Sequence, residues 1–496
     1  MSHLMLSVSG CRGLVGSTLT PETVVRFVSA LACMLHDRRG ARSADLSAIA
    51  PGPAPAVGTF GKHRPRVVVG RDGRAGGHAI AHTAIGALTA SGCDVIDVGV
   101  AMTPTVGVAV DTFNADAGLV LTASHNPQEW NGLKPMLRDL KAKGPAASAP
   151  PAKSANALIE AYKKSRQNFR AWDEVGGIDS RAEQAVAAHR ERVIDVLDAL
   201  KATKAIRKAR PTVVLDSTNG SGRVATAAFL EELGCKVVAL GQSDSGIFEH
   251  TPEPTRENLG FLGGAIKKAR ARVGFAQDPD ADRLALIDEK GQYIGEEYTL
   301  VLAARALFSL RKPGKGATAV VNLSTSRMIE DVAASAGVKV HRSAVGEANV
   351  VEMMRAKGSM VGGEGNGGVI LPDVTFIRDS LTGMALTLAL MATTGKSLSE
   401  LVAEVPSYSI EKRKVEMPRR EEAGAAVEKI AAAFAHEKIN RSDGVWVDLS
   451  SRRSWLHVRA SNTEPIIRFI AEGPNPLAAK VLLDEAQRVI LQGLPK

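Results

Sequence analysis

The sequence predicts an α/β protein with three related α/β domains, which have mixed sheets around a central cleft, and a C-terminal α+β domain. Three observations support this fold class. One strand–helix–strand pattern occurs three times in the 496 residues, each copy is followed by an apolar strand that ends in a polar motif, and the last stretch departs from the pattern. A chain of this length is expected to form several domains.

The three repeats share one order of elements. Each has a buried apolar run, a polar loop, an amphipathic stretch closed by a glycine, and a second apolar run, which indicates strand, loop, helix and strand. The repeats begin at RVVVG (66–70), TVVLD (212–216) and TAVVN (318–322), and their helices close at Gly92, Gly234 and Gly337.

One further apolar strand follows each repeat and ends in a dense polar motif. The three stretches are GLVLTASHN (118–126), RVGFAQDPDADR (272–283) and SMVGGEGNGG (359–368). Ligands of open α/β sheets bind at the carboxyl ends of the strands. Three such loops from three domains therefore predict one shared cleft.

The stretch from about Ile410 is different, because its strands VWVDLS, SWLHVRA and PIIRFIAE follow one another between two long helical runs. It predicts a small α+β domain with a polar loop, RASNTEP. The predicted domains cover residues 1–185, 186–300, 301–405 and 406–496. Two segments rich in small residues, 37–65 and 141–155, are predicted to be insertions or loops.

Composition narrows the function classes. The formal net charge of +9 favours anionic partners, either phosphorylated metabolites or nucleic acid. The basic clusters RKAR and KKARAR lack interleaved aromatic residues, so they are interpreted as solvated faces and no nucleic-acid partner is expected. No apolar run is long enough for a membrane span, and arginines interrupt the early apolar residues. The four scattered cysteines favour a reduced, cytoplasmic protein.

The DPDADR motif gathers three carboxylates, those of Asp278, Asp280 and Asp282, at one turn. Unpaired carboxylates repel one another, so a hard cation is the expected partner. An EF-hand is disfavoured because Arg283 occupies the sixth position, where that loop needs glycine, and because the flanks are strand-like. Mg²⁺ suits the motif, since it takes few protein ligands; a solvated acidic turn is the alternative.

Ser124 admits three interpretations. A hydrolase nucleophile is disfavoured, because His125 is the adjacent residue and no GxSxG elbow surrounds the serine. SHNP is also good turn chemistry. A phosphoserine accounts for the carboxylates on the equivalent strand of the next repeat, because its dianion would supply a further metal ligand. Lys134 is then either a proton carrier and phosphate contact or an ordinary surface lysine.

Two more loops carry binding chemistry. The first is RASNTEP, whose arginine, hydroxyls and backbone N–H groups suit a phosphate dianion, although a plain hairpin turn is the alternative for this loop. In GGEGNGG, Glu364 and Asn366 lie among glycines that let a ligand approach closely, and together they suit vicinal sugar hydroxyls. The phosphate-binding candidates are Arg459, Ser461, Asn462, Thr463 and Arg468.

The loops TASHNP, DPDADR, GGEGNGG and RASNTEP, in this order, resemble those of the α-D-phosphohexomutase family. The resemblance extends from SGCRGLVG to about Glu472 and includes GRDGR and HTPEPTRENL. It implies four domains, a phosphate on Ser124, and Mg²⁺ held by that phosphate and the three aspartates. It also implies a hexose 1,6-bisphosphate intermediate that reverses its orientation without leaving the site and that also serves as activator. A hinge motion of the fourth domain would permit this reversal.

The resemblance assigns further roles. Glu364 and Asn366 would bind the sugar, and the RASNTEP candidates and Arg468 would hold the phosphate that is not transferred. Lys134, His125 and Arg283 would be catalytic residues, with Arg12 and Arg74 as additional phosphate contacts. The expected partner is a sugar phosphate, with neither nucleic acid nor membrane, and the chain is expected to be a monomer or homodimer.

The sugar loop departs from the pattern of many members. They have Glu-x-Ser-Gly-His, whereas this chain has asparagine at the serine position and Gly368 at the histidine position. The GEGNGG pattern resembles archaeal-type phosphoglucosamine mutases, so glucosamine phosphate is the expected substrate. Glucose and mannose phosphates are the alternative, because RASN is also found in phosphoglucomutase-like members. A non-catalytic sugar-phosphate binder would be expected to lose Ser124 or an aspartate, and none is lost.

Overall fold

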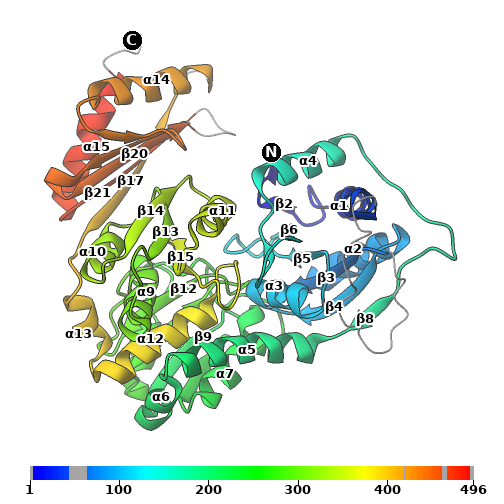
Figure 1. The fold of residues 1–496 in the computed structure, drawn as a ribbon, viewed down its shortest axis with the longest axis horizontal. Helices are drawn as coiled ribbons and strands as arrows, with labels where there is room; N and C mark the ends of the chain where they lie inside the picture. Colours follow the sequence, from blue (N-terminus) through cyan, green and yellow to red (C-terminus); the bar gives the residue numbers. More distant parts are fainter. Residues whose placement is uncertain (1–3, 44–63, 418–419, 461–465, 492–496) are drawn as a thin grey trace. The chain divides into compact units, whose positions relative to one another are not determined.

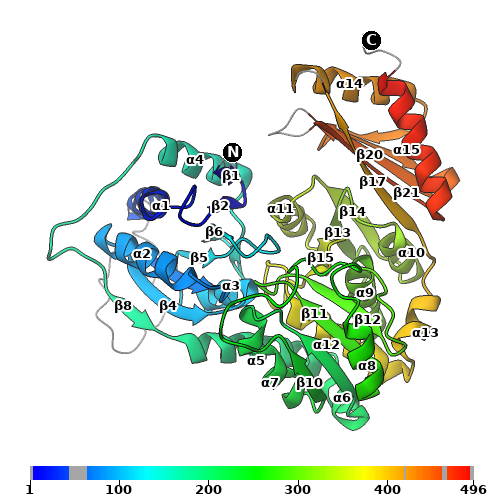
Figure 2. The same cartoon turned by 180° about the vertical axis from the view of Figure 1, so that it is seen from behind.

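The computed structural model describes residues 4–43, 64–417, 420–460 and 466–491. The chain divides into two compact units, the first formed by residues 1–311 and 366–400 and the second by residues 312–365 and 401–496. Most elements of both are labelled in Figures 1 and 2. Mixed and parallel α/β sheets and a C-terminal α+β domain confirm the predicted fold class.

The first sheet of the first unit has the strand order β1-β2-β6-β5-β3-β4-β8, with β7 beside β6. Strands β4, β3 and β5 are parallel, and β6 runs antiparallel to β5. The strands are β1 (Met5–Ser7), β2 (Gly10–Leu14), β3 (Arg66–Arg71), β4 (Asp94–Val100), β5 (Ala117–Leu121), β6 (Trp130–Arg138), β7 (Ala147–Ser148) and β8 (Ile178–Ser180). The helices are α1 (Pro21–Ser43), α2 (Gly77–Ala90), α3 (Thr103–Thr112), α4 (Ala152–Lys163) and α5 (Ala182–Ala199).

Helices cover both faces of this sheet (Figure 1). Val67 and Val69 on β3 pack into one apolar cluster with residues of α1 and α2. Val68, between them, packs into a second cluster with residues of α3. Successive side chains of a strand point to opposite faces, so a strand buried on both sides needs a continuous apolar run. This explains why RVVVG is apolar rather than alternating.

The second sheet repeats this arrangement. Its order β10-β9-β11-β12 matches β4-β3-β5-β6, with parallel pairs followed by one antiparallel strand. The strands are β9 (Thr212–Asp216), β10 (Lys236–Leu240), β11 (Val273–Gln277) and β12 (Leu284–Asp288). The other elements of this region are α6 (Thr203–Ala209), η1 (Ser221–Val224), α7 (Thr226–Glu232), α8 (Leu262–Ala269), α9 (Glu297–Arg311), β16 (Gly368–Ile370) and α12 (Ser380–Thr394).

The second unit joins two smaller layers. Strand β13 (Thr318–Asn322) pairs in parallel with β14 (Lys339–Ser343) and β15 (Val361–Glu364). The C-terminal sheet has the order β17-β21-β20-β19-β18 and packs against α14 and α15. The remaining bounds are α10 (Met328–Ser335), α11 (Glu347–Lys357), α13 (Leu398–Ala403), β17 (Ser409–Glu416), α14 (Arg420–Ala433), β18 (Lys438–Asn440), β19 (Val445–Leu449), η2 (Ser450–Arg452), β20 (Ser454–Ala460), β21 (Ile466–Gly473) and α15 (Pro476–Leu491).

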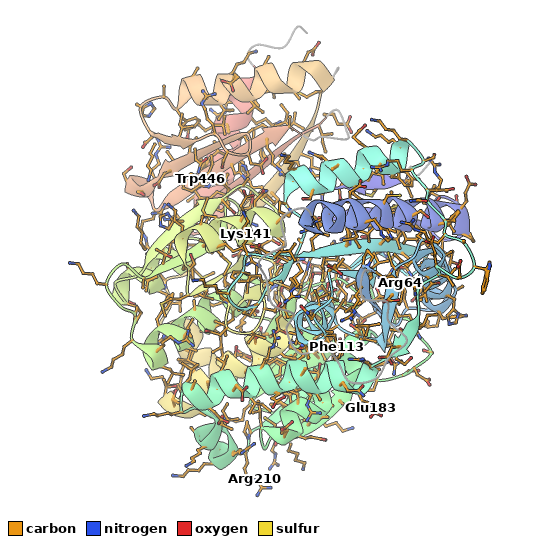
Figure 3. The ribbon with its side chains drawn as sticks, turned by 45° about the vertical axis from the view of Figure 1, so that its right-hand side comes forward. Arg64, Phe113, Lys141, Glu183, Arg210 and Trp446 are labelled. Atoms are coloured by element: carbon orange, nitrogen blue, oxygen red, sulfur yellow. The ribbon has the colours of Figure 1, made fainter. Side chains whose placement is uncertain are left out.

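Aromatic and charged contacts connect the C-terminal domain to residues 312–365. Trp446, labelled in Figure 3, and Trp455 pack against Leu323. The guanidinium carbon of Arg342 lies 5.2 Å from the centre of the Trp446 ring. The same guanidinium forms a bidentate ion pair with Glu330, which holds it in place. Cation–π contacts and bidentate pairs favour a fixed geometry. These contacts make the two parts one unit.

Parts of the segments predicted as loops form helix or strand. Residues 37–43 continue α1, and residues 141–155 include β7 and the first turn of α4. Asp111 accepts hydrogen bonds of 3.1 Å from the backbone N–H groups of Ala146 and Ala147, which fixes the stretch before β7. Alanine-rich sequence also favours helix. The prediction of loops was therefore wrong for these parts; residues 44–63 lie outside the described residues.

Candidate active site

Ser124 lies in the turn between β5 and the antiparallel strand β6. Its backbone has φ = 50°, a left-handed conformation that is uncommon for a residue other than glycine. The N–H of Ser124 donates to Thr122 Oγ1 (2.8 Å), and its hydroxyl donates to Asp278 Oδ2 (2.8 Å). The structure therefore brings the serine loop of the first repeat to the aspartate loop of the second.

Arg74 fixes the shape of the serine loop. It is 1% exposed, and its Nε donates to Asp72 Oδ2 (2.9 Å). Its remaining N–H groups donate to the backbone carbonyls of Ser124 (2.8 Å), Pro127 (3.2 Å) and Trp130. In this structure the guanidinium is thus committed to protein acceptors, while its role as a phosphate contact stays a prediction.

Arg74→Met should destabilise the first unit by about 3–5 kcal/mol, because it leaves Asp72 as a buried carboxylate without its partner charge. Thermal unfolding followed by circular dichroism would measure the effect. Arg311→Met is a matched control, since the Arg311–Asp373 ion pair is exposed by a third or more and should contribute little. Equal melting of the two variants would contradict this role of Arg74.

The three aspartates lie in the turn between β11 and β12 and are fully buried. Ala281 between them has φ = 54°, so the turn curls back on itself. Thr103, the first residue of α3, donates its hydroxyl to Asp280 Oδ2 (2.6 Å) and its N–H to the Asp280 carbonyl (2.9 Å). The first domain thus supports the turn of the second.

Two cations balance part of this negative charge. Lys134 on β6 donates from Nζ to Asp282 Oδ2 (2.7 Å) and to Asp280 Oδ2 (3.5 Å), and Arg378 donates from Nη2 to Asp282 Oδ2 (2.7 Å). Burial would raise the pKa of Asp282, but the charges of Arg378, Lys134 and Arg283 hold it well below its usual range. Burial and the neighbouring carboxylates raise the pKa of Asp278 well above its usual value.

The aspartate cluster fits a divalent cation. One carboxylate oxygen from each residue lies within 4.8 Å of the others. Among the described residues, Asp280 Oδ1 and Asp282 Oδ1 are buried and accept no hydrogen bond. Buried carboxylate oxygens normally have partners, and hard cations prefer such ligands. The three aspartates could therefore hold a metal ion.

Three more predicted residues lie around the serine. His125 Nδ1 is 3.3 Å from Ser124 Oγ, and Arg12 Nη1 donates to Asn126 Oδ1 (3.2 Å). Arg283 is joined to the cluster by its backbone N–H, which donates to Asp278 Oδ1 (3.1 Å). Burial, with the charges of Arg283 and Arg12, lowers the pKa of His125 to about 3. The imidazole is therefore neutral near pH 7.

The sugar-loop residues fall in both units. Glu364 ends β15 in the second unit, is buried, and accepts a hydrogen bond from Asn322 Nδ2 (2.9 Å). Asn322 ends the neighbouring strand β13, and its Oδ1 accepts from Thr325 Oγ1 (3.0 Å). Asn366 belongs to the first unit and lies beside Gly368. The carboxylate of Glu364 is thus held by a fixed amide.

Two arginines lie opposite each other in the C-terminal sheet. Arg459 on β20 is the register partner of Arg468 on β21, and Arg459 Nη1 donates to Asp443 Oδ2 (2.8 Å). Like charges on directly opposed residues are unfavourable unless anions balance them, and Asp443 balances the charge of Arg459. The role of both arginines as phosphate contacts stays a prediction. The other three candidates, Ser461, Asn462 and Thr463, lie outside the described residues.

Sequence reasoning missed three polar residues of these sites. They are Thr103, Asn322 and Arg378, which contact Asp280, Glu364 and Asp282 respectively. Thr103 and Asn322 follow or end apolar strands of the repeats, as Ser124 does. A search for polar residues at the ends of these strands would therefore also have found them. Arg378 carries no such signal, because FIRDS does not directly follow one of the apolar strands of the repeats.

The fold and the first unit's site define an enzyme of the phosphohexomutase class, an intramolecular phosphotransferase. Models of the phosphoglucomutase/phosphomannomutase family match the whole architecture: alpha/beta/alpha domain I at residues 54–167, domain II at 194–291, domain III at 295–408 and the C-terminal domain at 413–488. The chain therefore belongs to the phosphoglucomutase/phosphomannomutase family.

Individual proteins agree with this assignment. The chain is 36% identical to a phosphoglucomutase/phosphomannomutase of Thermococcus kodakarensis, with 98% of each chain covered. It is 35% identical to a probable phosphoglucosamine mutase of Methanopyrus kandleri, with 96% and 95% covered. A crystal structure of a phosphoglucomutase/phosphomannomutase family protein from Burkholderia thailandensis has the same fold, with a TM-score of 0.76, 23% identity and 99% of each chain covered.

Proposed function

We propose that this enzyme interconverts hexose 6-phosphates and hexose 1-phosphates through a phosphorylated Ser124, with glucosamine phosphate as its preferred substrate. The observation that carries the proposal is the contact between the Ser124 hydroxyl and Asp278 Oδ2 (2.8 Å), which places the serine oxygen on the rim of the aspartate cluster. In a hydrolase the base on this hydroxyl would come from a separate element. Here the nearby imidazole belongs to the adjacent residue, His125, and the hydroxyl donates to a carboxylate of the aspartate cluster.

The residues of the first unit supply the groups for the transfer. The phosphoryl group leaves Ser124 Oγ for the free hydroxyl of the sugar phosphate, and a nearby basic group takes the proton of that hydroxyl. Lys134 lies 2.7 Å from Asp282, where it can exchange a proton at the transfer point. Mg²⁺ held by the three aspartates would neutralise charge on the transferred phosphoryl group.

The second phosphate of the substrate needs a fixed holder. The opposed arginines Arg459 and Arg468 supply two planar forks for a phosphate dianion. After the first transfer the sugar carries phosphates at both ends, and its reversal exchanges their positions. The second transfer returns a phosphoryl group to Ser124. A hexose 1,6-bisphosphate added from outside would phosphorylate the resting serine, which makes it the proposed activator.

The sugar preference rests on the GEGNGG loop and on the relatives named probable phosphoglucosamine mutase. Glucose and mannose phosphates are the second candidates, because the 36% identical relative is a phosphoglucomutase/phosphomannomutase. The proposed partner is thus a small sugar phosphate.

None of the helices in the described ranges is long and apolar enough to cross a membrane. All four cysteines are free thiols, which supports action in the reducing cytoplasm.

The test is a coupled mutase assay with Mg²⁺ and a catalytic amount of glucose 1,6-bisphosphate. It compares glucosamine 6-phosphate, glucose 1-phosphate and mannose 1-phosphate by kcat/KM. We expect the glucosamine compound to rank first by about tenfold or more, which corresponds to about 1.4 kcal/mol of transition-state binding. A higher rank for glucose or mannose phosphate would overturn the sugar assignment. No turnover of any of the three would overturn the proposed activity.

A further inference from the structure

The space beside Gly368, at the first residue of β16, is filled by the side chain of Arg378. A Cβ atom at position 368 would lie 2.3 Å from Arg378 Cδ and 2.8 Å from Arg378 Cγ. Real Cβ atoms do not approach other carbons so closely, so a side chain at 368 would displace the arginine. Gly368 stands where many family members have a histidine. The absence of that side chain is therefore what admits Arg378.

The guanidinium that fills this space contacts the aspartate cluster. Arg378 is 8% exposed, and its Nη2 lies 2.7 Å from Asp282 Oδ2. A hydrogen bond between an arginine and a carboxylate is charge-assisted and directional. Lys134 reaches the same oxygen from β6, so Asp282 Oδ2 is held from two sides, while Asp282 Oδ1 is buried and accepts no hydrogen bond from the described residues.

The backbone of Arg378 is firmly placed. The next residue, Asp379, caps α12 by accepting hydrogen bonds from the N–H groups of Leu381 (2.9 Å) and Thr382 (3.2 Å). Asp379 also contacts Nε2 of the buried His189 (3.2 Å), which is anchored in turn by Thr105 (2.9 Å). An arginine at the start of a capped helix is pre-organised, so little conformational entropy is lost when it orients Asp282.

Charge explains why a cation is needed at this point. Three fully buried carboxylates lie in one turn, and a phosphoserine would add a dianion beside them. Buried charges are tolerated only when other charges and hydrogen bonds compensate them.

We propose that Arg378 is a positioning residue of the transfer site, a cation that this chain supplies from the start of α12 where many family members have the sugar-loop histidine. It orients the Asp282 carboxylate toward the metal site and balances the charge of the cluster. Gly368 is its required counterpart. This inference rests on the proposed function of the same site.

The first test removes and restores the guanidinium. We expect Arg378→Ala to lower kcat by about 10- to 100-fold and to weaken Mn²⁺ binding by a similar factor, the range for groups that orient a metal ligand. Free Mn²⁺ measured by electron paramagnetic resonance reports binding without any turnover. Added guanidinium chloride should restore part of both losses in Arg378→Ala. A purely structural role would not respond to it.

The second test uses the steric link between the two positions. Gly368→Ala should displace Arg378 and reproduce the loss, whereas adding Gly368→Ala to Arg378→Ala should cost little more. Such non-additivity is the mark of two residues that act through one interaction. In the Arg378→Ala background, Gly368→His should recover turnover above that of Arg378→Ala alone.

Matched controls are available on the same chain. Arg311→Ala removes an exposed arginine, and Gly264→Ala adds a Cβ atom where nothing lies within 4 Å. Both should bind Mn²⁺ and turn over like the wild type. Wild-type binding and turnover in Arg378→Ala, additive losses in the double variant, or no recovery with histidine would overturn the inference. A wild type without turnover would contradict the proposed function instead, and Mn²⁺ binding would still test Arg378.

Discussion

Ser124→Ala should lose turnover of every hexose phosphate by about 10⁴-fold or more, the scale seen when a nucleophile is removed. The reason is that the Ser124 hydroxyl donates a hydrogen bond to Asp278 Oδ2 and is the group proposed to carry the phosphoryl group beside the aspartate cluster. Coupled assays of wild type and variant would measure the loss. Intact-mass analysis should show one phosphoryl group on wild type treated with glucose 1,6-bisphosphate and none on the variant.

The fold should survive this change, because a loop-end serine contributes little to a core. Ser309→Ala is the matched control, since Ser309 lies on the exposed side of α9 and bonds only locally, to the Arg305 carbonyl (2.7 Å). It should keep wild-type turnover and phosphorylation. Normal turnover in Ser124→Ala with an unchanged melting curve would show that the phosphoryl group is carried elsewhere.

Asp280→Asn should raise the Mg²⁺ concentration needed for half-maximal activity, and lower kcat, by about 100-fold, because it removes a buried negative charge from the proposed metal site. Asp280 Oδ2 also accepts hydrogen bonds from the Thr103 hydroxyl (2.6 Å) and the Lys134 ammonium (3.5 Å). An asparagine amide satisfies these two donors less well than a carboxylate does. Titration with Mg²⁺ in the mutase assay would measure both effects.

The control for this loss is Asp373→Asn, which removes an exposed carboxylate paired with Arg311. Its Mg²⁺ dependence should match that of the wild type. If Asp280→Asn showed the same half-saturating Mg²⁺ concentration as the wild type, the aspartate cluster would not be the metal site. A change in kcat alone would assign Asp280 to the positioning of Lys134 and Thr103.

Much of the first unit's site could be predicted because its chemistry sits at repeated positions. Ser124 and the aspartates each follow a parallel strand and precede an antiparallel one, and the repeat in the sequence reveals that position. Parallel strands also need continuous apolar runs, which makes them easy to recognise. For the same reason the strand order of the second sheet could be anticipated from the first.

The contacts that support these loops could not be predicted in the same way. Arg74 follows a recognisable motif, yet only the structure shows that its guanidinium binds the carbonyls of the serine loop. Arg378 reaches Asp282 across 96 residues of sequence. Such partners depend on how helices stack on the sheets, and periodicity in a single sequence carries no information about that packing.

The left-handed backbone of Ser124 also restricts the choice of amino acid at that position. Threonine carries the same hydroxyl, but a β-branched residue is strained at φ = 50°, and Thr218 (φ = 46°) is the one threonine of the described residues with a positive φ. Aspartate tolerates this conformation far better than most residues do. Few amino acids therefore suit position 124, and an engineered permanent mimic of the proposed phosphoserine is best sought with aspartate rather than with a bulkier acid.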